Sequence, residues 1–393
     1  MKKHGKSVLF IVLIGIISLF SDMVYEGARG ITGPFLDTLH ANAFVVGLFA
    51  GLGEFIGYGL RLISGIWADR TKKYWTFVFS GYALNLLSVP LLALAGYWQI
   101  AVVLMMAERL GKAIRTPSRD ALMAGAAAEM GRGWAFGLHE ALDQIGATLG
   151  PLIMMAVLFF SNDNYPAAFG WTLIPALLAL SLLIVARNNQ PVKNPVISDK
   201  YKKIENLQDL LRHTPFLLYL AGAGFLAAGF TDFPLVAFHL KHNHIANDSL
   251  IPALYAMAMI VDAMAALALG KLYDRYGLIV LILSILVSLT FPLFTFSNSL
   301  TLMVIGVSLW GLGMGAQESI LRAVMADLAP AGKVATVFGW FNTAFGIAWF
   351  TGSAIMGGLY QISLFWLIFF SMLMQLASIS LFVLVLLKQK HGK

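Results

Sequence analysis

The chain has 393 residues, of which 59% are hydrophobic and only 12% are charged. A soluble domain carries about 25% charged residues, so this chain lacks the polar surface that a water-soluble globule of its size needs. The same composition excludes an intrinsically disordered chain, because such chains are rich in charge and poor in aromatic residues. The apolar residues fall in long runs, and the composition therefore predicts an integral membrane protein whose main partner is the lipid bilayer.

The net charge is +7 at pH 7, but the basic residues lie in short segments between apolar runs. No zinc-finger or RNA-recognition pattern accompanies them, so nucleic acid is not an expected partner. The chain has no cysteine, which excludes disulfides and thiolate chemistry. It also shows no phosphate-binding glycine loop, zinc-ligand pair or Ser-His-Asp pattern, so we expect no cofactor, no metal and no enzymatic activity.

Twelve apolar segments are long enough to cross a bilayer, which takes about 20 residues as a helix. The run 8–20 follows three lysines, as in a signal peptide, but no small-residue cleavage site comes after it, so it is expected to remain as the first transmembrane helix. Gly27, Gly30, Gly33 and Pro34 predict a bent or partly unwound outer end of that helix. The expected helices cover 7–37, 43–69, 73–96, 98–122, 132–160, 166–187, 215–240, 249–272, 277–297, 300–326, 334–358 and 361–387.

The polar segment 188–214 divides the predicted helices into two sets of six, over 1–187 and 215–393. Of the 27 lysines and arginines, 19 lie in the termini and alternate connecting segments on one side of the membrane. Only Lys241 lies on the other side, and the rest are within the predicted helices. The positive-inside rule therefore predicts that both termini and the 188–214 segment face the cytoplasm, in a bacterial inner membrane.

The two halves repeat one another in sequence. The second and eighth predicted helices both end in G-x-[WL]-x-D-R, 205 positions apart. Parallel repeats of six helices are typical of transporters whose substrate site lies between the halves near the bilayer midplane. The matched positions are Gly65, Asp69 and Arg70 with Gly270, Asp274 and Arg275, then Pro34 with Pro234, Arg119 with Arg322, and Phe136-Gly137 with Phe338-Gly339.

Through these motifs the chain resembles the major facilitator superfamily over essentially its whole length. The resemblance implies an all-α membrane protein with 12 transmembrane helices in two six-helix pseudo-symmetric bundles, working as a monomer by alternating access. It also implies that the glycine of the motif lets the second helix approach the eleventh, while Asp69 faces the N-terminus of the eleventh helix. A carboxylate gains about 0.3–1 kcal/mol in that position. The alternative is that the motif only solvates the loop and sets topology.

Gly137, Gly146, Gly150 and Pro151 in the fifth predicted helix resemble the G-x8-G-x3-G-P motif of drug:proton antiporters, with Met154-Met155 where paired glycines are usual. This resemblance implies a gating role and favours export slightly over uptake. The alternative is only a close helix contact with a proline bend. The segment 108–120 resembles a fourth-helix signature of poorly characterised prokaryotic members, and matches the antiporter motif only through Arg109.

Ionisable residues at a helix centre cost about 2.5–3.5 kcal/mol each, so by default they mark function. Asp22, Glu26 and Arg29 lie on one face of the first helix. Because two carboxylates one turn apart repel when both are ionised, we expect this pair to carry the coupling proton, with Glu26 the main carrier and Asp22 its partner. The candidate substrate-binding residues are Tyr25, Arg29, Glu54, Tyr58, Arg109, His139, Asp143, Gln144 and Asp232.

Other charges have simpler interpretations. Glu108 with Lys112, and Glu318 with Arg322, are i,i+4 pairs that are expected to neutralise each other. His239, His242 and His244 are expected in a solvated outer loop, with metal binding as the less favoured alternative.

The expected function is secondary active transport of a small organic solute, driven by protons, with export favoured slightly. A polar first half and an apolar second half suit an amphipathic organic solute. The alternative is proton-coupled uptake of an anionic metabolite or siderophore, favoured by Arg29, Arg109, Lys112 and Arg115. A non-transporting receptor would not need repeated gating loops, and an embedded enzyme would need a catalytic site that the sequence lacks.

Overall fold

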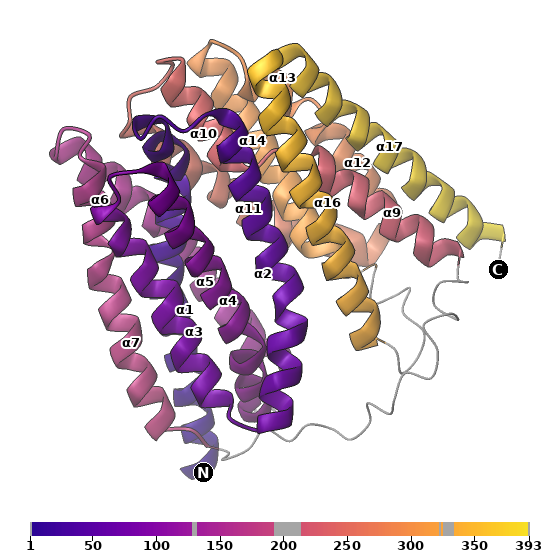
Figure 1. Cartoon of the computed structure of the whole chain (residues 1–393). Coiled ribbons are helices and arrows are strands. Elements are labelled where there is room, and N and C mark those ends of the chain that lie inside the picture. Colours follow the sequence, from indigo (N-terminus) through magenta and orange to yellow (C-terminus); the bar gives the residue numbers. More distant parts are fainter. Residues whose placement is uncertain (1, 128–131, 192–213, 322–323, 325–333, 392–393) are drawn as a thin grey trace. The chain divides into compact units, whose positions relative to one another are not determined.

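The computed structural model describes residues 2–127, 132–191, 214–321, 324 and 334–391. Within these residues the chain is helical, with turns and no strand, so the prediction of an all-α protein is confirmed. Figure 1 shows long helices joined by short connections. In the first half they are α1 (Lys2–Thr38), α2 (Ala43–Thr71), α3 (Tyr74–Leu91), α4 (Trp98–Ala127), α5 (Arg132–Phe160), α6 (Tyr165–Trp171) and α7 (Leu173–Asn188).

The second half begins with α9 (Thr214–Gly229) and α10 (Phe233–His242). It continues with α11 (Leu250–Tyr276), α12 (Ile279–Ser288), α13 (Phe291–Thr295), α14 (Leu300–Ala316), a π-helical turn (Gln317–Leu321), α16 (Val334–Ile362) and α17 (Leu364–His391). Nine helices of the described part of the chain are long and apolar enough to cross a membrane. The total of twelve spans stays a prediction.

Three expected helices are each broken into two, at 172, 230–232 and 289–290. A proline follows every break. Its ring clashes with the carbonyl of the residue four positions earlier and it donates no backbone hydrogen bond. Pro175 stands four residues after the end of α6, Pro292 four after the end of α12, and Pro234 five after the end of α9.

The first helix is not unwound at its outer end, because α1 is helical without interruption from Lys2 to Thr38, and the alternative of a bend stays a prediction. Its glycines instead allow close approach of neighbouring helices. A Cβ added at Gly27 would lie 3.1 Å from the carbonyl carbon of Gly150 on α5. A Cβ added at Gly30 would lie 3.1 Å from the Tyr255 ring on α11.

The described helices form two compact units. Unit 1 comprises Met1–Ala41, Ile56–Ser198 and Asn247–Ala256, and unit 2 comprises Asn42–Phe55, Asp199–Ala246 and Met257–Lys393. Inside unit 1, α1 packs against α4, α5 and α7, and α3 packs against α4. Inside unit 2, α9 packs against α16 and α17, and α14 packs against α12 and α13. The beginning of α2 therefore groups with unit 2, and the beginning of α11 groups with unit 1.

The α1–α5 contact is the most extensive among the described helix pairs of unit 1, and small residues on both helices leave no side chain between the backbones. A Cβ added at Gly150 would lie 2.9 Å from both the Gly27 nitrogen and the Met23 Cα. Gly146 lies equally close to the backbone of Leu19. The glycines of the G-x3-G-P segment thus make a tight helix interface, which is the structural role expected for small residues in membrane helices.

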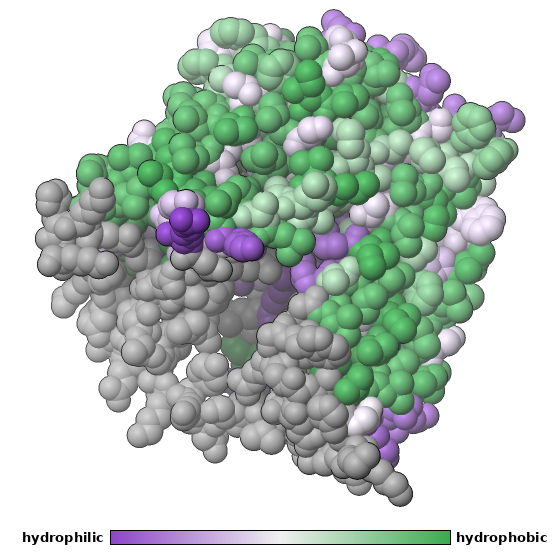
Figure 2. Space-filling model, turned by 180° about the vertical axis from the view of Figure 1, so that it is seen from behind, coloured by the Kyte–Doolittle hydropathy of each residue, from purple (hydrophilic) through white to green (hydrophobic). Residues whose placement is uncertain are grey.

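The outer surface of the described helices is mainly hydrophobic, as Figure 2 shows for one face. Large apolar side chains are almost fully exposed there, including Leu94, Phe160 and Leu267 at 80%, 83% and 80%. Charged side chains are instead buried inside, among them Asp22, Glu26 and Arg115. A soluble protein has the opposite distribution, with charged residues outside and apolar residues inside, so this arrangement identifies a multi-pass membrane protein.

Candidate functional site

A cluster of buried charges lies inside unit 1, where α1 meets α4. Asp22 and Glu26 are 8% and 6% exposed, and Arg29 follows on the same helix face. The Lys112 ammonium of α4 lies 3.5 Å from the centre of the Tyr25 ring, and the Arg109 guanidinium lies 6.0 Å from it. Lys112 also acts electrostatically on both Asp22 and Glu26. The structure therefore brings five predicted site residues together with Lys112.

Glu108 and Lys112 do not pair, which corrects the expected i,i+4 ion pair. The Glu108 carboxylate lies 3.3 Å from Arg109 Nε and accepts a 2.7 Å hydrogen bond from Asn85 on α3. The Lys112 side chain extends to the Tyr25 ring instead. A cation on an aromatic face is attracted by the ring quadrupole, but its charge is not neutralised. Arg322, the partner expected for Glu318, lies outside the described residues.

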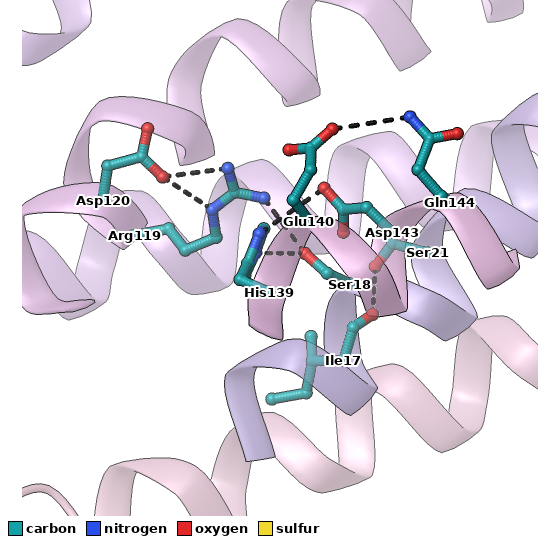
Figure 3. A network of polar contacts seen from close by, with 9 residues as sticks. All are labelled: Ile17, Ser18, Ser21, Arg119, Asp120, His139, Glu140, Asp143 and Gln144. Atoms are coloured by element: carbon teal, nitrogen blue, oxygen red, sulfur yellow. Dashed lines mark hydrogen bonds and ion pairs between the residues drawn. The ribbon is translucent and has the colours of Figure 1, made fainter. Parts of the chain in front are cut away.

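A second polar network joins α1, α4 and α5 (Figure 3). Arg119 binds Asp120 at 2.9 Å and donates a 3.1 Å hydrogen bond to Ser18 Oγ. Ser18 Oγ lies 2.8 Å from His139 Nε2, and His139 Nδ1 lies 3.6 Å from the Asp143 carboxylate. This network connects the predicted residues His139 and Asp143 to the helix that carries Asp22.

Ser18 was missed by the sequence argument, although it stands one turn before Asp22 on the same helix face. Gln144 was predicted as substrate-binding, and its amide donates a 3.4 Å hydrogen bond to Glu140. Figure 3 shows that pair on α5, apart from the Ser18–His139 contact. Since Glu140 is exposed, Gln144 lies at the edge of the network.

The predicted residues of α2 are divided between the two units. Tyr58 and Arg61 belong to unit 1, where the Arg61 guanidinium lies 4.9 Å from the centre of the Tyr58 ring. Arg61 also acts electrostatically on Lys112. Glu54 is buried and belongs to unit 2.

Asp232 lies in unit 2, in the break between α9 and α10, and is 2% exposed. Its carboxylate accepts hydrogen bonds of 2.8 Å from Trp349 Nε1 and from Ser353 Oγ on α16. The preceding carbonyl, that of Thr231, accepts a 2.8 Å hydrogen bond from Trp310. The broken helix thus presents a buried carboxylate that accepts hydrogen bonds from a tryptophan and a serine of α16.

The repeated loop motifs have local partners in each unit. A Cβ added at Gly65 would lie 3.3 Å from Pro117 on α4, and Asp69 accepts a 2.9 Å hydrogen bond from the Tyr74 hydroxyl. Gly270 lies near Ser319, and the Arg275 guanidinium lies over the Tyr276 ring. Arg70 is exposed. The described part of the chain does not include the surroundings of Gly137, the Asp274 side chain or the side chains at the start of α16. The latch expected for Asp69 therefore stays a prediction.

The outer-loop assignment is wrong for His239. This residue lies on α10 and is fully buried, with Nδ1 at 2.9 Å from the Tyr360 hydroxyl and 2.9 Å from Asn243 Nδ2. α10 continues to His242, so the helix holds His239 inside unit 2, while His242 and His244 are exposed as expected. Within the described ranges, no three His, Cys, Asp or Glu side chains are grouped so that they could hold a metal ion.

Buried charges inside membrane-spanning helices, arranged in two repeated halves, define a polytopic membrane protein of the transporter class. The family model of the Major Facilitator Superfamily matches residues 11–353. The chain belongs to this superfamily.

Relatives and solved structures agree with this assignment. An uncharacterized protein of Mycobacterium tuberculosis is 39% identical over 359 residues, covering 90% of this chain and 87% of the relative. An uncharacterized MFS-type transporter of Methanocaldococcus jannaschii is 28% identical, covering 90% and 89%. The nucleoside transporter NupG has a TM-score of 0.76 at 11% identity, covering 95% of this chain and 99% of that one.

A bacterial homolog of the human lysosomal transporter Spinster, in an inward-facing and unoccupied conformation, has a TM-score of 0.71 at 14% identity. It covers 97% of this chain and 95% of that one. At these identities the solved structures show that the fold is shared. Together the comparisons support a secondary transporter with a small-molecule substrate.

Proposed function

We propose that this transporter moves a small organic solute across the bacterial inner membrane by alternating access, coupled to protons that bind at Asp22 and Glu26. The observation that carries the proposal is the buried cluster in which both carboxylates lie near Lys112 and Glu26 also lies near Arg29. Binding of a proton or of a charged solute changes the field on the other, because all these charges share one poorly solvated site. Such mutual influence is the physical requirement for coupling.

The direction that we propose is export. Its support is the resemblance of the α5 segment 137–151 to the motif of drug:proton antiporters. In an antiporter, a cationic or neutral solute and the proton exclude one another from the site. Deprotonation of Glu26 then accompanies solute binding on the cytoplasmic side, and proton entry accompanies solute release on the outer side.

A thermal-shift screen on the purified protein identifies the solute, because a bound ligand raises the apparent stability by mass action. Candidate solutes are tested as matched pairs of similar size, one carrying an amine and the other a carboxylate. The solute that binds is then added to proteoliposomes that contain the protein, with an imposed pH gradient across the membrane, and its concentration inside the vesicles is measured. Accumulation against the solute gradient that disappears with a protonophore supports the proposal, and accumulation that ignores the pH gradient contradicts it.

A second candidate function is proton-coupled uptake of an organic anion. The observation that favours it is the position of Lys112 on the Tyr25 ring rather than on Glu108, since the ring leaves the cation charged and able to attract an anion. In the same screen, carboxylate solutes would shift the melting temperature and their amine counterparts would not. Lys112→Gln would then abolish that shift.

Orientation provides a prediction that does not need the substrate. Because the basic residues favour one side so strongly, we expect both termini and the 188–214 segment to be cytoplasmic. Since the natural chain has no cysteine, Lys200→Cys and Asn243→Cys each introduce a single label site. An impermeant maleimide should label Asn243→Cys in intact cells and Lys200→Cys only in inverted vesicles. Labelling of both from the same side would contradict the topology.

Asp69→Asn should slow transport about two- to fivefold and leave solute affinity unchanged, since a carboxylate at a helix N-terminus contributes about 0.3–1 kcal/mol to one conformation. Transport rate and thermal-shift affinity are measured side by side. Tyr74→Phe is the matched control, because it removes only the hydrogen bond to Asp69 within unit 1. Loss of solute binding in folded Asp69→Asn protein would contradict a gating role.

A further inference from the structure

The first turns of α11 pack against α1 within unit 1, through one polar and one apolar contact. Tyr255 is 1% exposed, and its hydroxyl donates a hydrogen bond to Glu26 Oε2. Its ring lies beside Gly30, one turn further along α1. A Cβ at Gly30 would meet both the Tyr255 ring, at 3.1 Å, and Pro252 Cα, at 3.5 Å. The glycine therefore lets α11 come close enough for the Tyr255 hydroxyl to reach the carboxylate.

The polar contact depends on the charge of Glu26, whereas the apolar contact does not. A hydroxyl that donates to an ionised carboxylate makes a charge-assisted hydrogen bond, roughly twice as strong as one between neutral groups. Protonation removes that charge and adds a donor to a group that was only an acceptor. The packing of the Tyr255 ring on Gly30 remains. Protonation of Glu26 thus weakens the polar contact between the start of α11 and α1 and leaves the apolar contact in place.

Other charged and titratable groups surround Glu26 and respond to the same proton. Arg29 of α1 and Lys112 of α4 act electrostatically on the Glu26 carboxylate. Asp143 of α5 acts on Asp22, and Arg61 of α2 acts on Lys112, so both influence Glu26 indirectly. Apart from Tyr255, none of these groups belongs to α11, so among them Tyr255 alone links the charge of Glu26 to that helix by a hydrogen bond. The groups are Asp22, Tyr25 and Arg29 on α1, Arg61 on α2, Arg109, Lys112 and Arg115 on α4, Asp143 on α5, and Tyr255 on α11.

We propose that the Tyr255 hydroxyl links the protonation state of Glu26 to the packing of the start of α11 against α1, an inference that rests on the proton-coupled function proposed above. When Glu26 is ionised, the hydrogen bond holds the start of α11 against α1. When Glu26 binds a proton, the start of α11 is released. Tyr255 is a positioning residue, since it carries neither the proton nor the solute.

The test uses a single cysteine at Ala256, which is 1% exposed and lies one turn after Pro252 on the same face of α11. An impermeant maleimide is added from the outer side to the full chain in membranes. Between pH 8 and pH 5 we expect labelling of Ala256→Cys to become about fivefold faster, relative to labelling of the exposed position Asn247→Cys. This ratio removes the opposite effect of pH on the thiol itself, which reacts more slowly as its thiolate fraction falls.

Tyr255→Phe keeps the ring on Gly30 and removes only the hydroxyl. In this background Ala256→Cys should be labelled fast at both pH values, with no remaining pH response. Glu26→Gln, which cannot ionise, should give the same result, and the double variant should add nothing to either single change. The matched control is Tyr219→Phe, because Tyr219 is fully buried and its hydroxyl donates to the Leu321 carbonyl rather than to a carboxylate. It should keep the wild-type pH response.

A wild-type pH response in Tyr255→Phe would overturn the proposal, whatever the transport assay shows. If Tyr255→Phe does not fold, the same outcome in Glu26→Gln overturns it, because that variant leaves Tyr255 intact. The proposed function fails by a different result, namely proteoliposomes of the wild-type protein in which accumulation ignores the pH gradient. Loss of the labelling response in Tyr255→Phe together with that result would support the link through Tyr255 and reject proton-driven transport.

Discussion

Glu26→Gln is expected to abolish accumulation driven by a pH gradient while leaving solute binding and solute exchange intact. With one proton per solute, a gradient of one pH unit supports up to about tenfold accumulation, because 1.36 kcal/mol corresponds to a factor of ten. Glutamine has the shape of the protonated side chain but cannot release a proton. In proteoliposomes the accumulation ratio should therefore fall to about one, whereas exchange of labelled for unlabelled solute should continue.

Two further variants make this result specific to the α1 cluster. Glu140→Gln is the matched control, since Glu140 is exposed on α5 and contacts Gln144, and it should accumulate solute as the wild type does. Asp22→Asn should reduce accumulation as well, because Asp22 is the electrostatic neighbour of Glu26. Wild-type accumulation in both Glu26→Gln and Asp22→Asn would exclude this site and leave Glu54 and Asp143 as the next carriers to test.

The helices could be predicted from hydropathy because a bilayer demands long apolar segments and few other arrangements satisfy the backbone in lipid. The breaks within three of them could not. Pro175, Pro234 and Pro292 follow breaks, yet Pro34, Pro90, Pro117 and Pro151 lie inside continuous helices. A proline only removes one hydrogen bond and introduces a clash, and neighbouring helices decide whether the helix continues.

The α1 part of the site was predictable for a related reason. The spacing of Asp22, Glu26 and Arg29 places them on one helix face, and charges in a membrane must face the protein interior. Their partners on other helices carry no comparable signal. Lys112 has an i,i+4 acid within its own helix, but it lies on the Tyr25 ring. Tyr255 comes from the other half of the sequence, 229 positions after Glu26, and only the folded chain shows that contact.

The buried environment of His239 could not be predicted from the sequence either. The sequence places three histidines and a lysine between two apolar runs, a composition typical of an exposed loop. In the structure α10 extends through His239, and its imidazole finds Tyr360 and Asn243 as polar partners in unit 2. Because one helical turn separates a buried residue from an exposed one, a boundary error of two or three residues reverses the predicted environment.

Gly150→Leu is expected to destabilise unit 1 strongly, because the new side chain has no room between α5 and α1. Even the first added carbon would lie 2.9 Å from the Gly27 nitrogen and the Met23 Cα, and these are backbone atoms that cannot rotate away. Overpacking of this kind costs about 1–3 kcal/mol or more. We expect the apparent melting temperature of the detergent-purified protein to fall by about 4 °C.

The matched control for this prediction is Gly170→Leu, since Gly170 is an exposed helical glycine with nothing within 4 Å of an added Cβ. Its melting temperature should stay near that of the wild type. Equal melting temperatures for the two variants would show that α1 and α5 do not need their close contact. If the contact is needed, Gly150→Leu should also impair pH-driven accumulation in whatever protein remains folded. The reason is that the α1–α5 interface sets the position of Asp22 and of the Ser18–His139 contact, and separating the helices would pull this polar network apart.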